Sequence, residues 1–209
     1  MQTIVYLIRH SKKLDNSLID LSLSDDDYQI AREKIILSSE GEERAKKLSD
    51  LPELQDVETI YSSDHVRAIQ TAKYLAEKKQ IKINIDSRFN ERKGGIYKDV
   101  ISLKEYYQDD YKNSEGESPR EVRERTYNAF NDAVKNNKGK KIAVFGHGAS
   151  LTFLLTNWCK LENIAEDKRK TLSFNGEIIF DKIFGTPEVF KIIVDDDKIT
   201  SVENIELGF

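Results

Sequence analysis

Short apolar runs, separated by longer stretches with helical spacing, organise this chain. Ile4 to Ile8 and Ile142 to Phe145 are such runs, and each predicts a buried parallel strand. Apolar side chains recur at helical spacing in two stretches, which predicts helices over residues 64–78 and 120–136. Strands that alternate with helices in this way are typical of an α/β fold.

The remaining elements follow from weaker patterns. Further strands are predicted at Val57–Tyr61 and Ile81–Ile85, with edge strands at Ser173–Phe180, Val189–Val194 and Ile199–Leu207 and a hairpin turn at Asp195-Asp196-Asp197. Further helices are predicted from Ser39 to about Leu51, from Leu103 to Tyr111 and from Ala149 to Cys159. We therefore expect a three-layer α/β/α sandwich around a mixed, mainly parallel sheet. Residues 1–209 form a single domain in this prediction, and residues about 96–118, which are polar and rich in tyrosine, form a lid or substrate-facing insertion.

Composition narrows the class of protein. Charged residues make up 33% of the 209 residues, and 33 basic against 37 acidic side chains give a net charge of -4. A nucleic-acid-binding protein would show a basic excess, so we expect no nucleic-acid partner. The single cysteine, Cys159, cannot form an intrachain disulfide, and no signal peptide or membrane span is apparent. These features favour a cytoplasmic protein with no membrane partner.

Two of the predicted strands end in histidine. Arg9 and His10 follow the first run, and His147 follows the second within Gly146-His147-Gly148. The carboxyl ends of parallel strands form the ligand-binding edge of an open sheet, so we expect both imidazoles at that edge. One such histidine could equally be a core imidazole, but the protein has only three in total. The matched contexts favour a shared role, in which His10 attacks a phosphoryl group.

Groups that could hold a phosphate gather at the same edge. A phosphoryl group in transfer carries negative charge on three oxygens, which guanidinium groups, imidazole N–H groups and helix N-terminal amides stabilise. Arg9 adjoins His10, and Arg67 falls in the first turn of the helix that follows the second strand. Taken alone, Arg67 could be a solvated helix arginine. Because His147 also precedes a predicted helix, the three side chains can converge on one anion.

The order of these motifs resembles that of the histidine phosphatase superfamily, with its phosphoglycerate mutase-like fold. The resemblance runs from residue 4 to about residue 155, and its most specific part is Arg67-Ala68-Ile69-Gln70-Thr71-Ala72. The other matching segments are Leu7-Ile8-Arg9-His10 with Asn16, Phe89-Asn90-Glu91-Arg92 with Gly95, Gly116-Glu117-Ser118 with Arg125, and Phe145-Gly146-His147-Gly148.

The resemblance implies a role for each matching residue. His10 would be the nucleophile that forms a phosphohistidine. Glu91, which without the resemblance would be a surface carboxylate, would protonate the leaving oxygen and later take a proton from water. Arg9, Arg67 and His147 would hold the phosphoryl oxygens. Substrate binding would involve Asn16, Ser11, Ser63 and Gly148. The resemblance implies no cofactor and no metal, because the cationic pocket stabilises the charge.

The chain also departs from the family pattern. Ser11 stands where the family has glycine, and Lys12 and Lys13 replace an acidic residue and a hydroxyl residue. Two added lysines predict a preference for multiply anionic small-molecule phosphate esters, unless both face solvent. His65 stands where the family has an apolar residue, and we expect it to be structural or half-exposed.

The most direct prediction is a phosphomonoester hydrolase that works through a phosphohistidine. Two alternatives stay open at this point. The first is phosphoryl transfer of the mutase type, which the short, arginine-poor segment from Gly95 to Gly116 disfavours. The second is a protein that binds phosphate without catalysis, which the complete set of five central residues disfavours. The physiological substrate and the oligomeric state cannot be inferred from these patterns.

Overall fold

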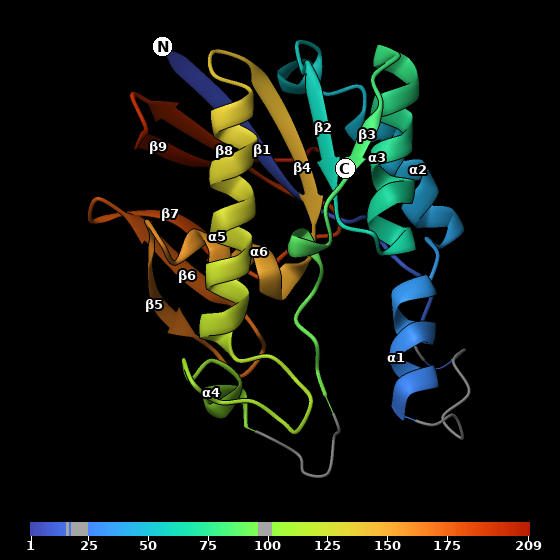
Figure 1. Cartoon of the computed structure of the whole chain (residues 1–209), viewed down its shortest axis with the longest axis vertical. Coiled ribbons are helices and arrows are strands. Elements are labelled where there is room, and N and C mark those ends of the chain that lie inside the picture. Colours follow the sequence, from blue (N-terminus) through green and yellow to red (C-terminus); the bar gives the residue numbers. More distant parts are fainter. Residues whose placement is uncertain (16, 18–24, 96–101) are drawn as a thin grey trace.

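The computed structural model describes residues 1–15, 17, 25–95 and 102–209, and a six-stranded sheet forms its centre (Figure 1). The strands are β1 (Gln2–Arg9), β2 (Thr59–Ser62), β3 (Ile83–Ile85), β4 (Lys141–Gly146), β5 (Lys160–Ile164), β6 (Lys170–Phe174), β7 (Glu177–Lys182), β8 (Glu188–Asp195) and β9 (Lys198–Ile205). The helices are α1 (Asp25–Lys34), α2 (Ser39–Leu48), α3 (Val66–Lys79), α4 (Leu103–Tyr106), α5 (Pro119–Asn136) and α6 (Gly148–Leu155), with single 3-10 turns η2 (Pro52–Leu54) and η3 (Ser87–Phe89).

The main sheet has the strand order β3-β2-β4-β1-β8-β9. The first four strands are parallel to one another, and β8 runs antiparallel to both of its neighbours. This confirms the predicted mixed, mainly parallel sheet. It also puts β1 and β4 side by side in the middle of the sheet, so that the residues following them meet at its carboxyl edge.

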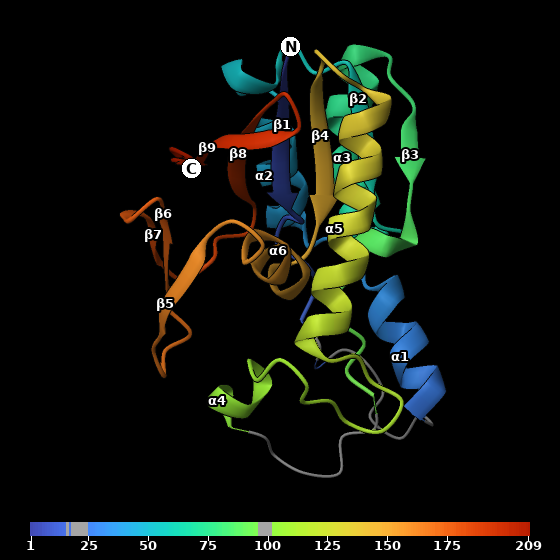
Figure 2. The ribbon, with the colours of Figure 1, turned by 60° about the vertical axis from the view of Figure 1, so that its left-hand side comes forward.

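Alternation along the central strands divides the core into the three predicted layers. Val5 and Leu7 of β1 face a cluster that includes α5 and α6, whereas Tyr6 and Ile8 face one that includes α2 and α3. Because successive side chains of a strand point to opposite faces, a continuous apolar run is what a strand covered on both sides requires. Figure 2 shows the two helical layers on either side of the sheet.

A second, three-stranded sheet corrects one prediction. Residues 173–180 do not form one edge strand of the main sheet. They span a hairpin between β6 and β7, which pairs with β5 in a separate sheet beside α6. Asn175 and Gly176 form its turn with positive φ values of 52° and 87°, a conformation that asparagine and glycine favour. The run of apolar residues on both sides of this turn concealed it.

Several predicted boundaries also shift. The helix predicted to reach Cys159 ends at Leu155, and the one predicted over residues 103–111 is the single turn α4. The strand predicted from residue 81 begins at Ile83. The helix predicted over residues 64–78 begins at Val66, with His65 as its N-cap residue. The Asp195-Asp196-Asp197 turn between the last two strands is confirmed.

Candidate active site

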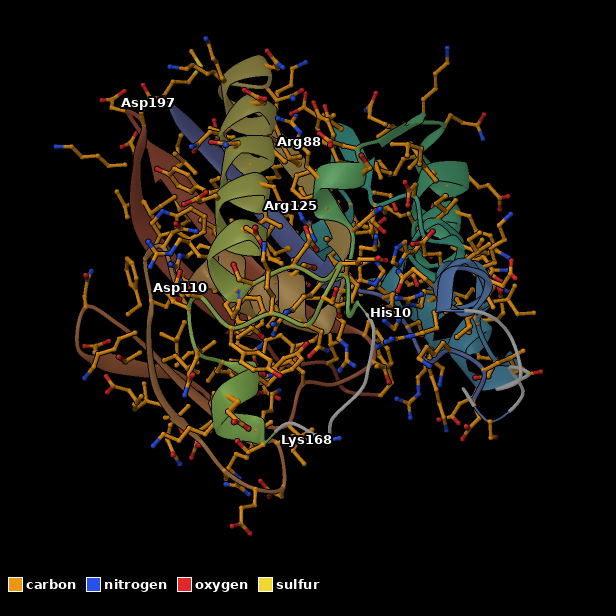
Figure 3. All side chains as sticks on the ribbon, turned by 60° about the horizontal axis from the view of Figure 1, so that its bottom comes forward. His10, Arg88, Asp110, Arg125, Lys168 and Asp197 are labelled. Carbon is orange, nitrogen blue, oxygen red and sulfur yellow. The ribbon has the colours of Figure 1, made fainter. Side chains whose placement is uncertain are left out.

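His10 and His147 meet at the carboxyl edge of the sheet because their strands are neighbours. Arg9 stands opposite Gly146 in the parallel register, and the His10 amide donates to the Gly146 carbonyl at 2.9 Å. The two imidazoles therefore leave adjacent strands at the same level. Their ring centroids are 5.2 Å apart, and both rings are buried. Figure 3, in which His10 is labelled, looks toward this end of the molecule.

A single hydrogen bond sets the tautomer of His10. Its Nδ1 lies 2.7 Å from the carbonyl oxygen of Ser11, within a buried contact. A carbonyl oxygen only accepts, so Nδ1 of a neutral ring must carry the proton. The lone pair is therefore on Nε2, which is the nitrogen left to act as a nucleophile.

The surroundings of His10 keep its imidazole neutral. Burial lowers the pKa of His10 well below its usual value, and the nearby charges of Arg67 and Arg9 lower it further. A neutral imidazole has the lone pair that nucleophilic attack requires.

Four buried side-chain nitrogens in the described part of the chain have no hydrogen-bond partner, and all four surround His10 and His147. They are Nε of Arg9, Nε of Arg67, Nδ1 of His147 and Nδ1 of His65. Buried polar groups in proteins are nearly always paired, so such a cluster needs a reason. Nitrogens of two guanidinium groups beside an imidazole form a site suited to the oxygens of an anion.

Backbone acceptors hold the two arginines in place. Nη1 of Arg9 donates to the carbonyl oxygens of Phe184 and Gly185 at 2.7 and 3.1 Å. Nη1 of Arg67 donates to the carbonyl oxygen of Arg32 at 2.8 Å. Burial lowers the pKa of both guanidinium groups, that of Arg67 to about 10, and the charge of Glu91 opposes this change. Both groups thus stay cationic at neutral pH.

His147 contacts both Ser63 and His65. Its Nε2 lies 2.7 Å from the hydroxyl oxygen of Ser63, which also accepts from the His65 amide at 3.3 Å. The ring of His65 packs against it, with centroids 4.6 Å apart. The unpaired Nδ1 of His147 is therefore on the edge of the ring away from Ser63.

Glu91 reaches the N-terminus of α6. Its Oε1 accepts from the amides of Arg92 at 2.9 Å and Ser150 at 3.0 Å, and its Oε2 accepts from Ala149 at 3.2 Å. Amides in the first turn of a helix have no partner within the helix and attract negative charge. Because α6 begins directly after His147, these bonds hold the carboxylate at the same edge as the histidines.

Arg125 of α5 fixes the loop that carries Glu91. Its guanidinium donates to the backbone oxygens of Arg88, Asn90 and Glu91 at 2.7, 3.0 and 3.2 Å, and it is ion-paired with Glu117 at 2.6 Å. Arg125 is labelled in Figure 3. Arg125 and Glu117 thus position the carboxylate of Glu91 without belonging to the cluster around His10.

A model of the histidine phosphatase superfamily (branch 1) matches residues 5–175. The chain belongs to this superfamily. A search of curated proteins found no significant match.

Solved structures similar to this superfamily member include three phosphatases. A mycobacterial glucosyl-3-phosphoglycerate phosphatase has a TM-score of 0.70 at 15% identity, over 98% of this chain and 97% of that one. A phosphoserine phosphatase from Entamoeba histolytica, as a mutant in complex with phosphoserine, has a TM-score of 0.62 at 17% identity over 96% of each chain. A putative alpha-ribazole-5'-P phosphatase from Escherichia coli has a TM-score of 0.65 at 17% identity, over 97% of this chain and 96% of that one. These likenesses confirm the phosphoglycerate mutase-like fold.

The predicted substrate-binding residues have different surroundings. The hydroxyl of Ser11 donates to the Gly41 carbonyl at 2.7 Å, and its amide donates to Thr71 at 2.9 Å, so this side chain faces α2 and α3. Gly148 packs on Arg9, because an added Cβ would lie 3.3 to 3.6 Å from the guanidinium atoms. Asn16 lies outside the described residues, as does the first part of the predicted insertion, residues 96–101.

The two lysines that depart from the family pattern also differ. Lys12 is ion-paired with Glu40 at the surface. Lys13 is half-buried, and burial together with the charges of Arg67 and Arg32 lowers its pKa. Only Lys13 therefore adds to the positive potential of the site.

His65 was predicted to be structural or half-exposed, and the structure agrees with the structural alternative. It is buried against His147, and burial lowers its pKa to about 3. His65 lies two residues after Ser63 and two before Arg67, which were both predicted site residues. This spacing was the signal that could have placed His65 at the site.

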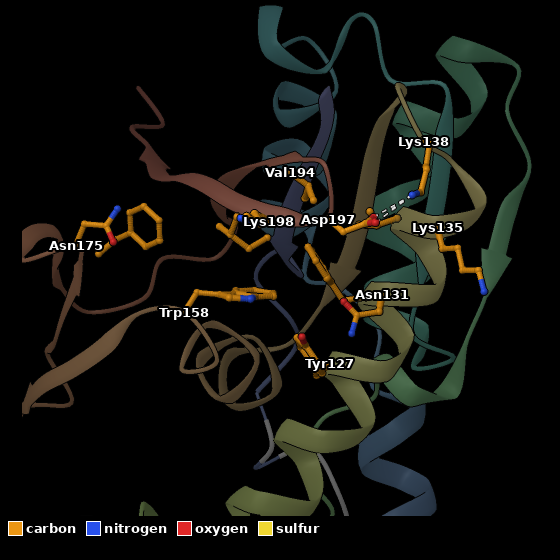
Figure 4. A pocket seen from close by; sticks show the side chains of 13 residues that line it. Tyr127, Asn131, Lys135, Lys138, Trp158, Asn175, Val194, Asp197 and Lys198 are labelled. Carbon is orange, nitrogen blue, oxygen red and sulfur yellow. Dashed lines mark hydrogen bonds and ion pairs between the residues drawn. The ribbon is translucent and has the colours of Figure 1, made fainter. Parts of the chain in front are cut away.

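A large open cleft elsewhere holds none of the predicted catalytic residues (Figure 4). It lies between α5 and the β8–β9 hairpin, and Lys135, Lys138, Trp158 and Lys198 are among its lining residues. None of the helices in the described ranges is both long and apolar enough to cross a membrane.

Proposed function

We propose that this chain hydrolyses phosphomonoesters through a phosphohistidine on His10. The Nε2 lone pair attacks phosphorus, a P–N bond forms, and the bond from phosphorus to the ester oxygen breaks. Water then attacks the phosphohistidine, the P–N bond breaks, and inorganic phosphate is released. The buried Nδ1 contact to the Ser11 carbonyl supports this, because it directs the lone pair of His10 to Nε2.

The cluster of unpaired nitrogens carries the proposal. Nε of Arg9, Nε of Arg67 and Nδ1 of His147 are buried without partners among the described residues, and the charges of Arg9 and Arg67 act on both His10 and His147. Fixed donors of this kind stabilise the charge of a transferring phosphoryl group without reorganisation. His147 contributes if Ser63 donates to its Nε2, because its Nδ1 then carries the proton.

Glu91 serves as the general acid and base of the proposal. A protonated carboxyl group can keep the two shorter contacts of Oε1, with Arg92 and Ser150, while Oε2 gives up its longer contact with Ala149 and donates to the leaving oxygen. The same oxygen takes a proton from the attacking water in the second step. The partners that we propose are small-molecule phosphate esters, and no cofactor or metal has a part in these steps.

A mutase and a phosphate-binding protein without activity are the alternatives. A mutase must retain the phosphoryl group on the enzyme and return it to a bound acceptor. The presence of Glu91 and His10 at one edge, together with phosphatases among the similar structures, favours hydrolysis over both.

The experiment follows 4-nitrophenyl phosphate in rapid-quench assays, without any bisphosphate, and detects phosphohistidine by mass spectrometry under alkaline conditions. We expect steady release of inorganic phosphate and a phosphoryl group on His10. The rate of phosphate release should fall at least about 10³-fold in His10→Ala. Arg67→Met should lose about 10²- to 10³-fold, as for an oxyanion donor.

Ser62→Ala is the matched control, because Ser62 is buried nearby but bonds only to the backbone among the described residues. Phosphate release without phosphohistidine at His10 would refute the proposed intermediate. A phosphohistidine that turns over only when a bisphosphate is added would support a mutase.

A further inference from the structure

Lys170 is a buried cation near the active site. It begins β6, and only 8% of its surface is exposed. Its Nζ lies 4.3 Å from the centroid of the Phe184 ring, and the carbonyl oxygen of the same Phe184 accepts from Arg9. Phe184 therefore joins Lys170 to Arg9 and thus to the carboxyl end of β1.

No ion pair or hydrogen bond of the Lys170 ammonium is found among the described residues. Burying an unpaired charge is costly, so lysines in such positions usually have an anionic partner. The two nearest candidates have other partners. Glu188 bonds to the Gly185 amide at 2.7 Å and is ion-paired with Lys182 at 3.4 Å, and Glu91 bonds to the amides of α6.

The electrostatic surroundings agree with this geometry. Burial and, to a smaller extent, the charge of Arg9 lower the pKa of Lys170 to about 8, while the charge of Glu91 opposes this change. Two of the groups proposed to act on the phosphoryl group thus interact with Lys170. Glu91 is the group proposed to protonate the leaving oxygen, so the charge that acts on Lys170 belongs to the residue that would face the leaving group.

We propose that Lys170 binds a second anionic group, a carboxylate or a second phosphate, on the leaving group of the substrate. This inference rests on the proposed function, because it assumes that Arg9 and Glu91 face the phosphoryl group and the leaving oxygen. The substrate class is then small phosphomonoesters with an acidic group close to the ester. Lys170 is a specificity residue in this arrangement, and the reaction steps do not pass through it.

Matched ligand pairs test the proposal by calorimetry, in a full-length His10→Ala background that prevents turnover. Glycerol 3-phosphate and 3-phosphoglycerate differ only in that a hydroxymethyl group replaces a carboxylate. Fructose 6-phosphate and fructose 1,6-bisphosphate test a second phosphate instead. We expect one of the two pairs to show about 10- to 100-fold tighter binding of the more anionic member, as for one charged hydrogen bond.

Substitutions assign this ratio to Lys170. Lys170→Met should reduce it to about 1, and Lys170→Arg should retain most of it because the guanidinium stays charged. Lys160→Met, an exposed lysine in the same small sheet, should leave the ratio as it is. Circular dichroism and cooperative unfolding will show whether each variant folds. If Lys170→Met does not fold, Lys170→Gln takes its place.

The pH dependence of the ratio separates binding from packing. The charged groups that act on Lys170 are Arg9 of β1 and Glu91 of the loop after η3, while Lys182 and Glu188 pair with each other. Because burial lowers the pKa of Lys170 to about 8, we expect the ammonium to lose its charge, and the ratio to fall, as pH rises from 7 to 9. It should not fall in Lys170→Arg.

Two outcomes overturn the proposal: neither pair shows a ratio above about 2, or Lys170→Met keeps the ratio. A failure of the proposed function looks different. Absence of phosphohistidine on His10 with an intact, Lys170-dependent ratio would remove the hydrolase and keep the anion site. Turnover through His10 with equal affinity for both members of each pair would keep the hydrolase and remove the anion site.

Discussion

Ser63 and His147 share a buried hydrogen bond of 2.7 Å between the hydroxyl oxygen and Nε2. Ser63 follows β2 and His147 follows β4, which are neighbouring parallel strands, so the bond crosses the carboxyl edge of the sheet. The hydroxyl also accepts from the His65 amide, which directs its proton toward the imidazole. We therefore propose that Ser63 acts on the substrate through His147, since its oxygen already contacts His147 and the His65 amide.

Removing this hydroxyl should reduce activity. In Ser63→Ala, the imidazole of His147 is free to adopt the tautomer with a lone pair on Nδ1, which repels a phosphoryl oxygen. We expect kcat/KM for 4-nitrophenyl phosphate to fall about 10- to 100-fold, and Ser63→Thr to recover most of it because threonine keeps the hydroxyl.

Ser62→Ala provides the control for this prediction, because it removes a buried hydroxyl that bonds to the Ser63 carbonyl instead of to His147. Orthovanadate inhibition should weaken in parallel with activity in Ser63→Ala. Equal effects of the two alanine substitutions would show that the bond has no part in orienting His147.

The lowered pKa of His10 predicts how the rate depends on pH. Burial, Arg67 and Arg9 keep this pKa below the ordinary 6.5, so the imidazole stays neutral as pH falls through 6.5. We expect kcat/KM, corrected for ionisation of the substrate, to show no loss centred near pH 6.5. Arg67→Met removes the larger of the two charge effects, so its acid limb should move to higher pH. This account would be contradicted if the wild-type rate fell with a pKa near the ordinary histidine value and Arg67→Met left that pKa unchanged.

Arg125 should matter most when the leaving group is poor. Arg125→Lys loses the fork that binds three backbone oxygens around Glu91, so the carboxylate is less well positioned. Hydrolysis of an alkyl phosphate, which needs a proton on its leaving oxygen, should fall roughly 10- to 100-fold. Hydrolysis of 4-nitrophenyl phosphate, whose leaving group needs little protonation, should fall much less.

Arg123→Lys is the matched control for Arg125→Lys, because Arg123 lies on the same helix and pairs with Asp109 at the surface. The ratio of the two substrate rates separates a positioning role from a loss of folding, which would lower both rates equally. An Arg125→Lys variant with an unchanged ratio would remove Arg125 from the positioning of Glu91.

The sequence predicted the centre of the fold better than its margin. Apolar runs that end in Arg9-His10 and Gly146-His147 predicted two buried strands, because a strand covered on both faces must be apolar throughout. The strand β5 has mostly exposed side chains and left no such pattern. Without it, the β6–β7 hairpin had no sheet to join, so one edge strand of the main sheet was predicted in its place.

The candidate site divides in the same way. The proposed nucleophile His10, with Arg9 and His147, directly follows or ends a strand, which local patterns reveal. Lys170 lies in the charged run Glu166-Asp167-Lys168-Arg169-Lys170, where a sequence alone predicts a solvated side chain. Its burial depends on Phe184, and the two residues come together only through pairing of β6 and β7 and the chain that follows. Long-range contacts of this kind leave no local signal.

The contact of Arg9 with the Phe184 and Gly185 carbonyls joins residues 175 and 176 positions apart. During synthesis on the ribosome, the guanidinium therefore has no such acceptors until the chain is nearly complete. β1 likewise pairs with β8, a strand near the end of the chain, so this pairing is also among the last steps open to the nascent polypeptide. The backbone acceptors of Arg9 and the last strands of the main sheet thus become available at the same stage of synthesis, so the proposed phosphate pocket cannot be complete before the sheet is.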